Sequence, residues 1–249
     1  MLDALAQKFR SLGLDRDEDL DAFLRIVKVR RDGTRGEDVV GSGSSPKYLT
    51  VLLAGLTCLY ESLEDGGRQI YAFQYPGDFC DLHSYVLPEP DMALAVGALT
   101  ECFTGIIYYK DLDPTIRRHP QLGLALWRAS MLEASILRER LLNVSRRPAL
   151  ERVAHLLCQE LTRREAVGIY SAIVPLTQID LADAAGLSVV HVNRIFQDLR
   201  KLGVLSENGR VIEVVSKKGL VGVAKFYRGY LDMPKRLSQW QVRIEGAAD

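Results

Sequence analysis

The spacing of apolar residues changes along the chain, and each change marks a different kind of secondary structure. Near the N-terminus, apolar residues recur at helical spacing, which predicts one or two short helices within residues 1–20. Between about residues 24 and 110, short runs rich in Val, Ile and Tyr alternate with turn signals that contain Gly or Pro. The Asp65-Gly66-Gly67 turn predicts a hairpin over residues 59–70. This region is therefore expected to form a β-barrel or β-sandwich.

Helical spacing returns after the β-rich region. Pro114 predicts the start of a short helix, and Pro120 predicts the start of a long helix that continues to about residue 147. The long helix carries two apolar stripes, which predict burial against its own β-domain and against the same helix of a second copy. A core helix of a monomer is the alternative. The first stripe comprises Leu124, Trp127, Met131, Ala134 and Leu141, and the second comprises Leu122, Leu126, Ala129, Leu132 and Ile136.

The most specific pattern lies within residues 176–203. Thr177 fits a helix N-cap, with Asp180 three residues later as in a capping box, and Gly186 fits the left-handed residue that ends a helix. Ser188 fits the N-cap of a second helix. Two short helices joined by a turn that contains Gly form a helix-turn-helix. The expected inner face of the first helix is Ile179, Leu181, Ala182 and Ala185, and that of the second is Val192, Ile195, Phe196 and Leu199.

The flanking segments extend this unit. Before it, Arg146-Arg147-Pro148 interrupts the long helix and predicts a hinge, after which residues 149–165 predict one more amphipathic helix. After it, Asn208-Gly209 lies between two short apolar runs, which is a strong hairpin signal. A helix-turn-helix followed by a hairpin indicates a winged helix, used for DNA or, alternatively, only for protein contacts. The tail after Val215 has helical spacing and could pack on the winged helix or on a partner chain.

Charge is divided unevenly although the whole chain is neutral. The chain has 32 basic and 32 acidic residues, but residues 1–145 hold 16 basic and 21 acidic side chains. Residues 146–249 hold 16 basic and 11 acidic side chains, so their net charge is +5. The expected winged helix lies in this basic half, which fits a polyanionic partner such as DNA.

Composition and motifs exclude several classes of protein. An apolar fraction of 47% with 26% charged residues indicates a folded globular chain rather than a disordered one. The longest uncharged apolar run, residues 51–60, is too short to span a membrane, and the N-terminus shows no export pattern. The four cysteines lie far apart, which predicts reduced, buried thiols in a cytoplasmic protein. The sequence holds no phosphate loop, hydrolase motif or multi-histidine metal pattern, so an enzyme is not expected.

Candidate DNA contacts follow from the helix-turn-helix, whose second helix lies in the major groove with its N-terminal residues at base edges. Arg194 is the best base reader, because a guanidinium pairs bidentately with guanine, whereas Val190 could touch a thymine methyl. His191 and Asn193 could donate to bases or phosphates, and Gln197 shares their face. Solvated surface side chains are the alternative for His191 and Arg194. Phosphate contacts are expected from Thr177, Gln178, Ser188, Arg200 and Arg210.

This arrangement resembles the Crp/Fnr superfamily of bacterial transcription regulators. The resemblance is most specific at residues 187–194, where Arg194 matches the family's recognition-helix arginine, and at residues 75–79, which are similar to the start of its ligand cassette. Val190 stands near the family's second recognition residue, a glutamate, so the family's usual half-site is not expected. The resemblance implies an α+β fold with a cyclic-nucleotide-binding-like β-roll (a jelly roll) over residues 1–118, a dimerisation helix over 119–147 and a winged helix-turn-helix domain with a tail over 148–249.

The same resemblance implies the partners. These are a second copy of the chain, a near-palindromic double-stranded DNA operator, a small-molecule effector of the β-roll and, for an activator, RNA polymerase; no membrane partner is expected. Among the effector-pocket positions Asp81, Leu82, His83 and Ser84, Leu82 replaces the glutamate of cyclic-AMP-binding members. Asp91-Met92-Ala93 replaces their Arg-Ser, and an aspartate repels a phosphate, so cyclic AMP is not expected.

Cofactor chemistry leaves alternatives open. No cysteine precedes Cys58, unlike the N-terminal cluster of the family's iron–sulfur sensors, so no cofactor is expected. Haem is the alternative, because His83 is similar to the axial histidine of the carbon-monoxide sensor and Cys80 lies nearby. A structural elbow of Asp81, His83 and Ser84, a regulator with a vestigial pocket, and a metal- or haem-using β-barrel enzyme built on His83 and Cys80 are further alternatives.

Overall fold

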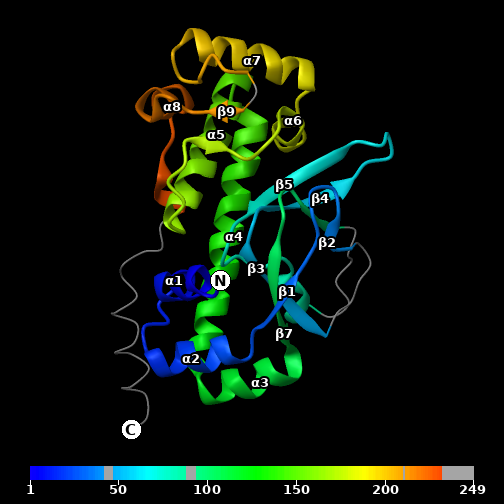
Figure 1. The fold of residues 1–249 in the computed structure, drawn as a ribbon, viewed down its shortest axis with the longest axis vertical. Coiled ribbons are helices and arrows are strands. Elements are labelled where there is room, and N and C mark those ends of the chain that lie inside the picture. The colour runs from blue at the N-terminus through cyan, green and yellow to red at the C-terminus, as the bar shows by residue number, and fades with distance from the viewer. Residues whose placement is uncertain (42–46, 88–93, 210, 232–249) are drawn as a thin grey trace.

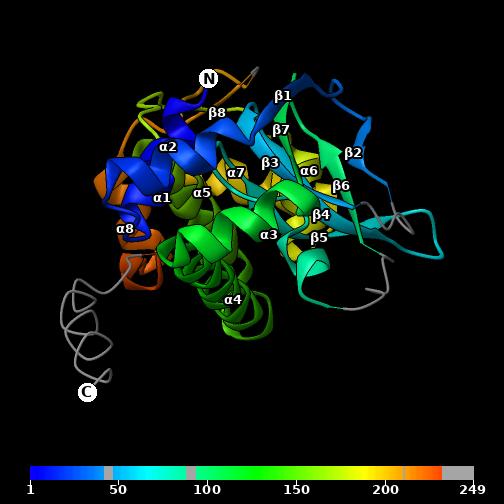
Figure 2. The same cartoon turned by 90° about the horizontal axis from the view of Figure 1, so that it is seen from below.

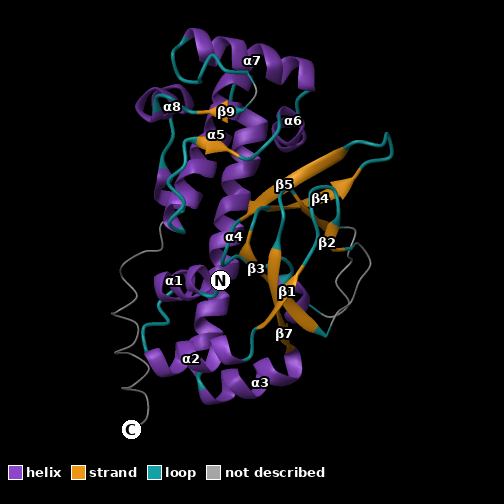
Figure 3. Ribbon diagram, viewed as in Figure 1, coloured by secondary structure: helices purple, strands orange, loops and turns teal. Residues whose placement is uncertain are grey.

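The long helix predicted after Pro120 organises the molecule. The computed structural model describes residues 1–41, 47–87, 94–209 and 211–231. Helix α4 (Pro120–Arg146) runs along the long axis, with the strands against one side of its middle and helices α5 to α8 around its upper end (Figure 1). Colouring by secondary structure separates the sheet-rich half from the helical upper end, which confirms the expected α+β class (Figure 3). The boundaries predicted for the three parts remain predictions.

Two antiparallel sheets form the β-roll predicted for the N-terminal half. The three-stranded sheet has the order β1-β7-β3, and the four-stranded sheet has the order β2-β6-β4-β5. The predicted hairpin is confirmed, since Glu61 lies opposite Gln69 and Ser62 lies opposite Arg68. The strands are β1 (Lys28–Arg31), β2 (Asp38–Val40), β3 (Tyr48–Ala54), β4 (Thr57–Ser62), β5 (Arg68–Gln74), β6 (Ala95–Ala98) and β7 (Phe103–Tyr108), and a short 3-10 helix, η1 (Leu82–Tyr85), follows β5.

Three short helices cover the lower end of the roll. The two helices expected near the N-terminus are α1 (Asp3–Ser11) and α2 (Asp17–Arg25), which meet through the tilted rings of Phe9 and Phe23 with centroids 4.3 Å apart. The expectation that Pro114 starts a helix is wrong, because α3 (Tyr109–Arg118) contains Pro114 in its interior. Tyr108 ends β7 in extended backbone, and the chain turns directly into the helix there. Pro114 removes the helical hydrogen bond to the carbonyl of Lys110, while Thr115 in the same turn donates its hydroxyl to the carbonyl of Asp111.

Helix α4 buries one of its two apolar stripes and exposes much of the other. Leu122, Leu126 and Ile136 of the second stripe are buried against α2, α3 and β5. In the first stripe, Trp127 is 63% exposed, Met131 49% and Leu141 67%. Viewed from below, one flank of α4 faces away from the β-roll (Figure 2). The burial against the β-domain is therefore confirmed, and the exposed stripe remains available to a partner.

The C-terminal half forms the predicted winged helix. Leu181 and Ala185 of the first motif helix are buried, but the expectation that Ile179 joins them is wrong, since it is 55% exposed. Ile179 precedes Leu181 by two residues, which is about 200° of helix rotation and places it on the opposite side. The elements are α5 (Ala149–Ala166), β8 (Ile173–Val174), α6 (Gln178–Ala185), α7 (Val189–Lys201), β9 (Ile212–Glu213), α8 (Lys217–Ala224) and the 3-10 helix η2 (Arg228–Tyr230).

The wing and the tail close the other side of this half. Leu205 pairs with Val214 on either side of the predicted Asn208-Gly209 turn, and β8 pairs with β9. The tail packs on α5 through the buried Leu220 and through a hydrogen bond of 3.2 Å from the Tyr230 hydroxyl to Oε1 of Gln159. Residues 216–231 therefore pack on the winged helix, one of the two surfaces considered for the tail, and residues 232–249 lie outside the described residues.

Candidate nucleic-acid interface

The first helix of the motif, α6, begins with a complete capping box. Oγ1 of Thr177 accepts from the backbone N–H of Asp180 at 3.1 Å, and Oδ2 of Asp180 accepts from the N–H of Thr177 at 2.8 Å. These bonds satisfy two N–H groups that a helix start otherwise leaves open. The helix ends at Gly186, whose φ of +63° is left-handed. Both features were predicted from the sequence and are confirmed.

The second helix, α7, is held by its own cap and by an apolar inner face. Oγ of Ser188 accepts from the N–H of His191 at 3.2 Å. The side chains of the predicted inner face, Val192, Ile195, Phe196 and Leu199, are all buried against α5 and α6. Because this face is fixed in the core, the opposite face of α7 is presented to solvent in one orientation.

The exposed face of α7 carries the predicted base readers. Val190 is 64% exposed, and His191, Asn193, Arg194 and Gln197 are exposed as well. Within the described part of the chain, the guanidinium of Arg194 makes no hydrogen bond or ion pair, so all its donors face solvent. A guanidinium with this freedom on a rigid helix has the donor geometry that guanine O6 and N7 accept.

The amide side chains of the same face are joined to one another. Nδ2 of Asn193 donates to Oε1 of Gln178 at 3.2 Å, and Nε2 of Gln197 donates to Oδ1 of Asn193 at 3.3 Å. This row bridges α6 and α7, so Asn193 is oriented by both neighbours instead of being free. The row leaves the Nε2 group of Gln178 and the Oε1 atom of Gln197 at its two ends, with unlike hydrogen-bonding character.

The predicted phosphate contacts divide into three cases. The hydroxyls of Thr177 and Ser188 accept N–H groups at helix starts, so they also retain a donor for an incoming oxygen. Arg200 instead donates its Nε–H to the carbonyl of Ser206 at 3.3 Å and braces the start of the wing. Arg210 lies outside the described residues. The helix starts thus offer donors toward DNA, whereas Arg200 is engaged within the protein.

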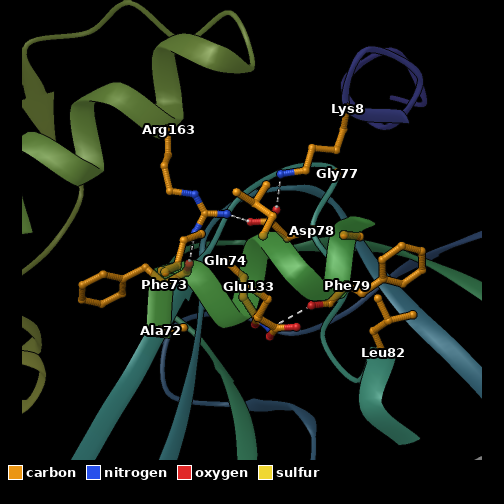
Figure 4. A pocket seen from close by; sticks show the side chains of 13 residues that line it. Lys8, Ala72, Phe73, Gln74, Gly77, Asp78, Phe79, Leu82, Glu133 and Arg163 are labelled. Atoms are coloured by element: carbon orange, nitrogen blue, oxygen red, sulfur yellow. Dashed lines mark hydrogen bonds and ion pairs between the residues drawn. The ribbon is translucent and has the colours of Figure 1, made fainter. Parts of the chain in front are cut away.

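A second polar cluster lies where the β-roll meets α1, α4 and α5. Asp78 accepts from Nζ of Lys8 at 3.1 Å and from the guanidinium of Arg163, which also donates to the carbonyl of Phe73 at 2.9 Å (Figure 4). Burial alone would raise the pKa of Asp78, but the positive charges of Arg163 and Lys8 outweigh it and lower that pKa. This carboxylate therefore stays charged and ties three elements together.

Two cavities adjoin this cluster. A small cavity of about 40 Å³ lies between β5 and α4, and a wider cleft of about 580 Å³ opens between α1, α5 and η2. Lys8, Asp78 and Arg163 line both. Glu133 lines the small cavity, and burial together with the negative charge of Asp78 raises its pKa to about 7. A group with this pKa changes charge near neutral pH.

Comparison with known proteins identifies the arrangement. Residues 151–222 match the family described as the Crp-like helix-turn-helix domain. A nitrogen fixation regulation protein FixK of Bradyrhizobium diazoefficiens is 32% identical over 179 residues, which cover 69% of this chain and 71% of that one. A probable transcriptional activator of Rhizobium leguminosarum bv. viciae is 30% identical over 189 residues, which cover 75% of this chain and 77% of that one. The chain belongs to the Crp/Fnr superfamily.

The Crp/Fnr fold extends over both halves of the chain. The structure of FixK2 from Bradyrhizobium japonicum superposes with a TM-score of 0.69, covering 80% of this chain and 97% of that one at 24% identity. Membership makes the protein a transcription regulator with a DNA-binding helix-turn-helix and not an enzyme. No helix in the described part of the chain is long and apolar enough to cross a membrane.

The effector-pocket positions named by the Crp/Fnr resemblance have different surroundings. Leu82 lines the small cavity beside α4. Asp81 is buried instead, with Oδ1 accepting from the N–H of Thr50 at 2.7 Å, and burial raises its pKa to about 7 despite that bond. Oγ of Ser84 donates to the carbonyl of Asp81 at 2.7 Å, so these two residues form part of the expected elbow. The Asp91-Met92-Ala93 segment lies outside the described residues.

His83 and Cys80 differ as haem ligands. Burial lowers the pKa of His83, and its Nε2 atom is buried without a hydrogen-bond partner among the described residues, which suits a ligating imidazole. Burial raises the pKa of the Cys80 thiol well above its ordinary value, so it stays protonated and suits ligation poorly. Neither of the two cavities described above is lined by His83. Across the described residues, no three His, Cys, Asp or Glu side chains are grouped to hold a metal ion.

Sequence reasoning missed two arginines of the β-roll that contact the helix-turn-helix. Arg35 and Arg68 donate to the carboxylate of Asp180, and Arg68 also donates to Asp183 at 2.7 Å. These pairs join residues more than a hundred positions apart along the chain, so no local sequence pattern predicts them. For the same reason, sequence reasoning missed three residues where the β-roll meets α1, α4 and α5, namely Lys8, Glu133 and Arg163. The clue available in the sequence was a pair of aspartates on α6, a helix whose other residues are apolar except Gln178.

Proposed function

We propose that the protein is a homodimeric, sequence-specific DNA-binding transcription regulator whose β-roll receives a signal and reorients the winged helices. The observation that carries the proposal is the outer face of α7, where Arg194 is exposed and unpaired among the described residues on a helix fixed by its cap and core. A helix presented in this way fits the major groove, with its N-terminal residues at base edges.

Dimerisation is supported by the exposed apolar stripe of α4. Trp127, Met131 and Leu141 would each bury a large apolar side chain if the same helix of a second copy packed against them. A two-fold axis along α4 would then place two α7 helices about 34 Å apart, one turn of DNA, on a near-palindromic operator. RNA polymerase is a further partner if the protein activates, and the cytoplasm is the expected location.

The signal acts through the β-roll and is not expected to be cyclic AMP. Leu82 stands where a ribose-binding glutamate would be needed, and it lies in the wall of a cavity of about 40 Å³ beside α4. No lysine or arginine among the four predicted pocket positions replaces the missing arginine. We take a small-molecule effector of unknown identity as the signal, with a vestigial pocket and ligand-independent activity as the alternative.

Haem sensing is a second candidate, favoured by the unpartnered Nε2 atom of His83. The imidazole would supply an axial ligand, and the haem would supply the gas or redox chemistry. An absorption spectrum of the protein purified with haem offered decides it. A Soret band that is lost in His83→Ala supports haem, and a featureless spectrum rules it out.

Arg194→Ala tests the DNA-binding proposal. Loss of a bidentate base contact should weaken specific operator binding roughly 10–100-fold in a gel-shift assay. Arg194→Lys is the matched control: it keeps the charge, so it should retain non-specific binding and salt dependence while losing operator preference. Size-exclusion chromatography should show both variants with the wild-type oligomeric state. Operator affinity that is unchanged in Arg194→Ala would exclude Arg194 as a base reader.

A further inference from the structure

Two arginines of the β-roll form ion pairs with the first helix of the DNA-binding motif. Arg68, the first residue of β5, donates from Nη2 to Oδ1 of Asp180 at 2.9 Å and from Nε to Oδ2 of Asp183 at 2.7 Å. Arg35 donates from Nη1 to Oδ2 of Asp180 at 3.0 Å and from Nη2 to the carbonyl of Pro175 at 3.2 Å. We call these four charged side chains the latch. It links α6 to the tip of the β4–β5 hairpin through Arg68 and to the loop between β1 and β2 through Arg35.

Burial makes the latch more than a surface ion pair. The Asp180 side chain is 1% exposed, and those of Asp183 and Arg68 are 20% and 29% exposed. Exposed ion pairs contribute little to stability, but removing one partner of a buried pair leaves an uncompensated charge. The same Asp180 carboxylate accepts the N–H of Thr177 in the capping box, so the arginines act on the atoms that start α6.

Arg68 is held in place from its own side as well. Its guanidinium lies over the ring of Tyr60, 5.6 Å from the centroid, and the Tyr60 hydroxyl donates to Oδ1 of Asp38 at 2.8 Å. Ser62 pairs with Arg68 across the hairpin, which fixes the backbone on which the guanidinium stands. A side chain restrained by a ring and a paired strand loses less freedom when it binds two carboxylates.

The far end of β5 contacts the DNA-binding half a second time. The carbonyl of Phe73 accepts from Nη1 of Arg163 on α5 at 2.9 Å, and the buried hydroxyl of Tyr75 donates to Glu160. Ile70 belongs to the same buried apolar cluster as Leu181 of α6. Strand β5 therefore meets α6 at its beginning and α5 at its end, and two separated contacts define an orientation that one contact cannot.

We propose that Arg68 and Arg35 are positioning residues for DNA reading, which hold α6, and through it α7, in the orientation that fits the operator. This inference rests on the proposed DNA-binding function. Neither arginine needs to touch DNA: each acts through Asp180 and Asp183 on the packing between α6 and α7, which places Arg194. Releasing the latch leaves the motif folded on α5 but free to turn against the β-roll.

Arg68→Ala in the full-length protein is the principal test. Operator affinity should fall roughly tenfold, within the range usual for coupling between sites. The slope of log affinity against log salt should stay at the wild-type value, because no phosphate contact is lost. Arg31→Ala is the matched control: Arg31 is also a β-roll arginine in an ion pair, with Glu101 at 2.7 Å, and should leave operator affinity unchanged.

A charge swap separates positioning from a general structural role. Arg68→Glu combined with Asp183→Arg should recover part of the operator affinity that Arg68→Glu loses, because the ion pair between positions 68 and 183 re-forms with reversed sign while the pair with Asp180 stays broken. Asp183→Asn is the second variant should Arg68→Ala fold poorly, since it weakens the same pair without touching the capping box. It should lower operator affinity in the same direction as Arg68→Ala.

Any of these outcomes would overturn the inference: unchanged or raised operator affinity in Arg68→Ala, an equal loss in Arg31→Ala, or no recovery in the swap. A reduced salt slope in Arg68→Ala would also overturn it, because it would make Arg68 a phosphate contact. Arg194→Ala distinguishes this failure from that of the proposed function. If Arg194→Ala loses operator binding while Arg68→Ala does not, only the positioning role fails.

Discussion

The helix caps of the helix-turn-helix and the ion pairs of the loop that follows β5 join groups over very different distances along the chain. In the helix-turn-helix, Thr177 bonds to Asp180 and Ser188 bonds to His191, each three residues away. In the loop, Asp78 accepts from Lys8, 70 residues earlier in the sequence, and from Arg163, 85 residues later. The helix caps are built from their own short segment, although Asp180 also accepts from Arg68 of the β-roll, whereas the ion pairs of Asp78 depend on the assembled molecule.

This difference explains why one region is readable and the other is not. A helix cap needs a hydroxyl or carboxylate at a fixed number of residues from the N–H group that it accepts. One short segment of sequence therefore predicts the whole interaction. A buried carboxylate needs a partner supplied by another element, and its protonation depends on how deeply the finished fold encloses it. Asp81, with a pKa raised to about 7, is the plainest example.

Removing the buried ring of Phe196 should have the largest effect and would test whether the helix-turn-helix depends on its own core. Phe196 is 1% exposed, so Phe196→Ala should lower the free energy of unfolding by about 3–5 kcal/mol, measured by chemical denaturation. The control Val190→Ala, on the exposed face of the same helix, should change it by less than about 0.5 kcal/mol. Equal effects of the two variants would contradict the assigned faces of α7.

Asp81→Asn would test whether the buried carboxyl in the loop after β5 makes the stability of the protein depend on pH. A carboxyl pKa raised on folding means that the folded state holds its proton more tightly, so stability falls as pH rises from about 4 through about 7. Replacing the carboxyl with a neutral amide should raise the free energy of unfolding at pH 8 by about 2–4 kcal/mol and flatten its dependence between pH 5 and pH 8.

Wild type and Asp81→Asn share Glu133, so the difference between their pH profiles isolates Asp81. The exposed Asp3→Asn should leave the profile as it is, because Asp3 lies at the surface beside the N-terminus. A profile for Asp81→Asn that is parallel to the wild-type profile would show that burial does not perturb this carboxyl.

Thr177→Ala should have the smallest effect and would sharpen the comparison at the level of one hydrogen bond. It removes the hydroxyl that caps α6, which should lower the free energy of unfolding by about 1 kcal/mol in the same denaturation assay. Thr177→Ser keeps the oxygen and should stay close to wild type. A loss in Thr177→Ser as large as in Thr177→Ala would place the effect in the methyl group instead of the cap.

Much of the fold could be predicted because its signals are local. The capped helices, the left-handed Gly186, the β4–β5 hairpin and the two stripes of α4 each follow from spacing within a few turns of chain. Ile179 was misplaced because an apolar residue in the first turn of a short helix was counted with the inner face. Pro114 was misread because the helix starts at Tyr109, directly after β7, and a proline pattern does not show where the preceding strand ends.

The candidate site was only partly predictable for the same physical reason. The exposure of Arg194 and Val190 follows from helix periodicity, but the link from Gln178 through Asn193 to Gln197 needs two helices in place. The effector region was inferred from four neighbouring residues, although the cavity there is also walled by α4 and α5. Glu133 and Arg163 reach this cavity only when the chain has folded.

The latch runs against the overall charge of the two halves. Residues 1–145 are acidic in sum and residues 146–249 are basic in sum, so at long range the halves attract each other without any preferred alignment. At the latch the signs are reversed: the acidic half contributes the cations Arg35 and Arg68, and the basic half contributes the anions. These four side chains are all paired only when the two halves dock in one alignment. The reversed charges therefore specify an alignment that net charge cannot provide.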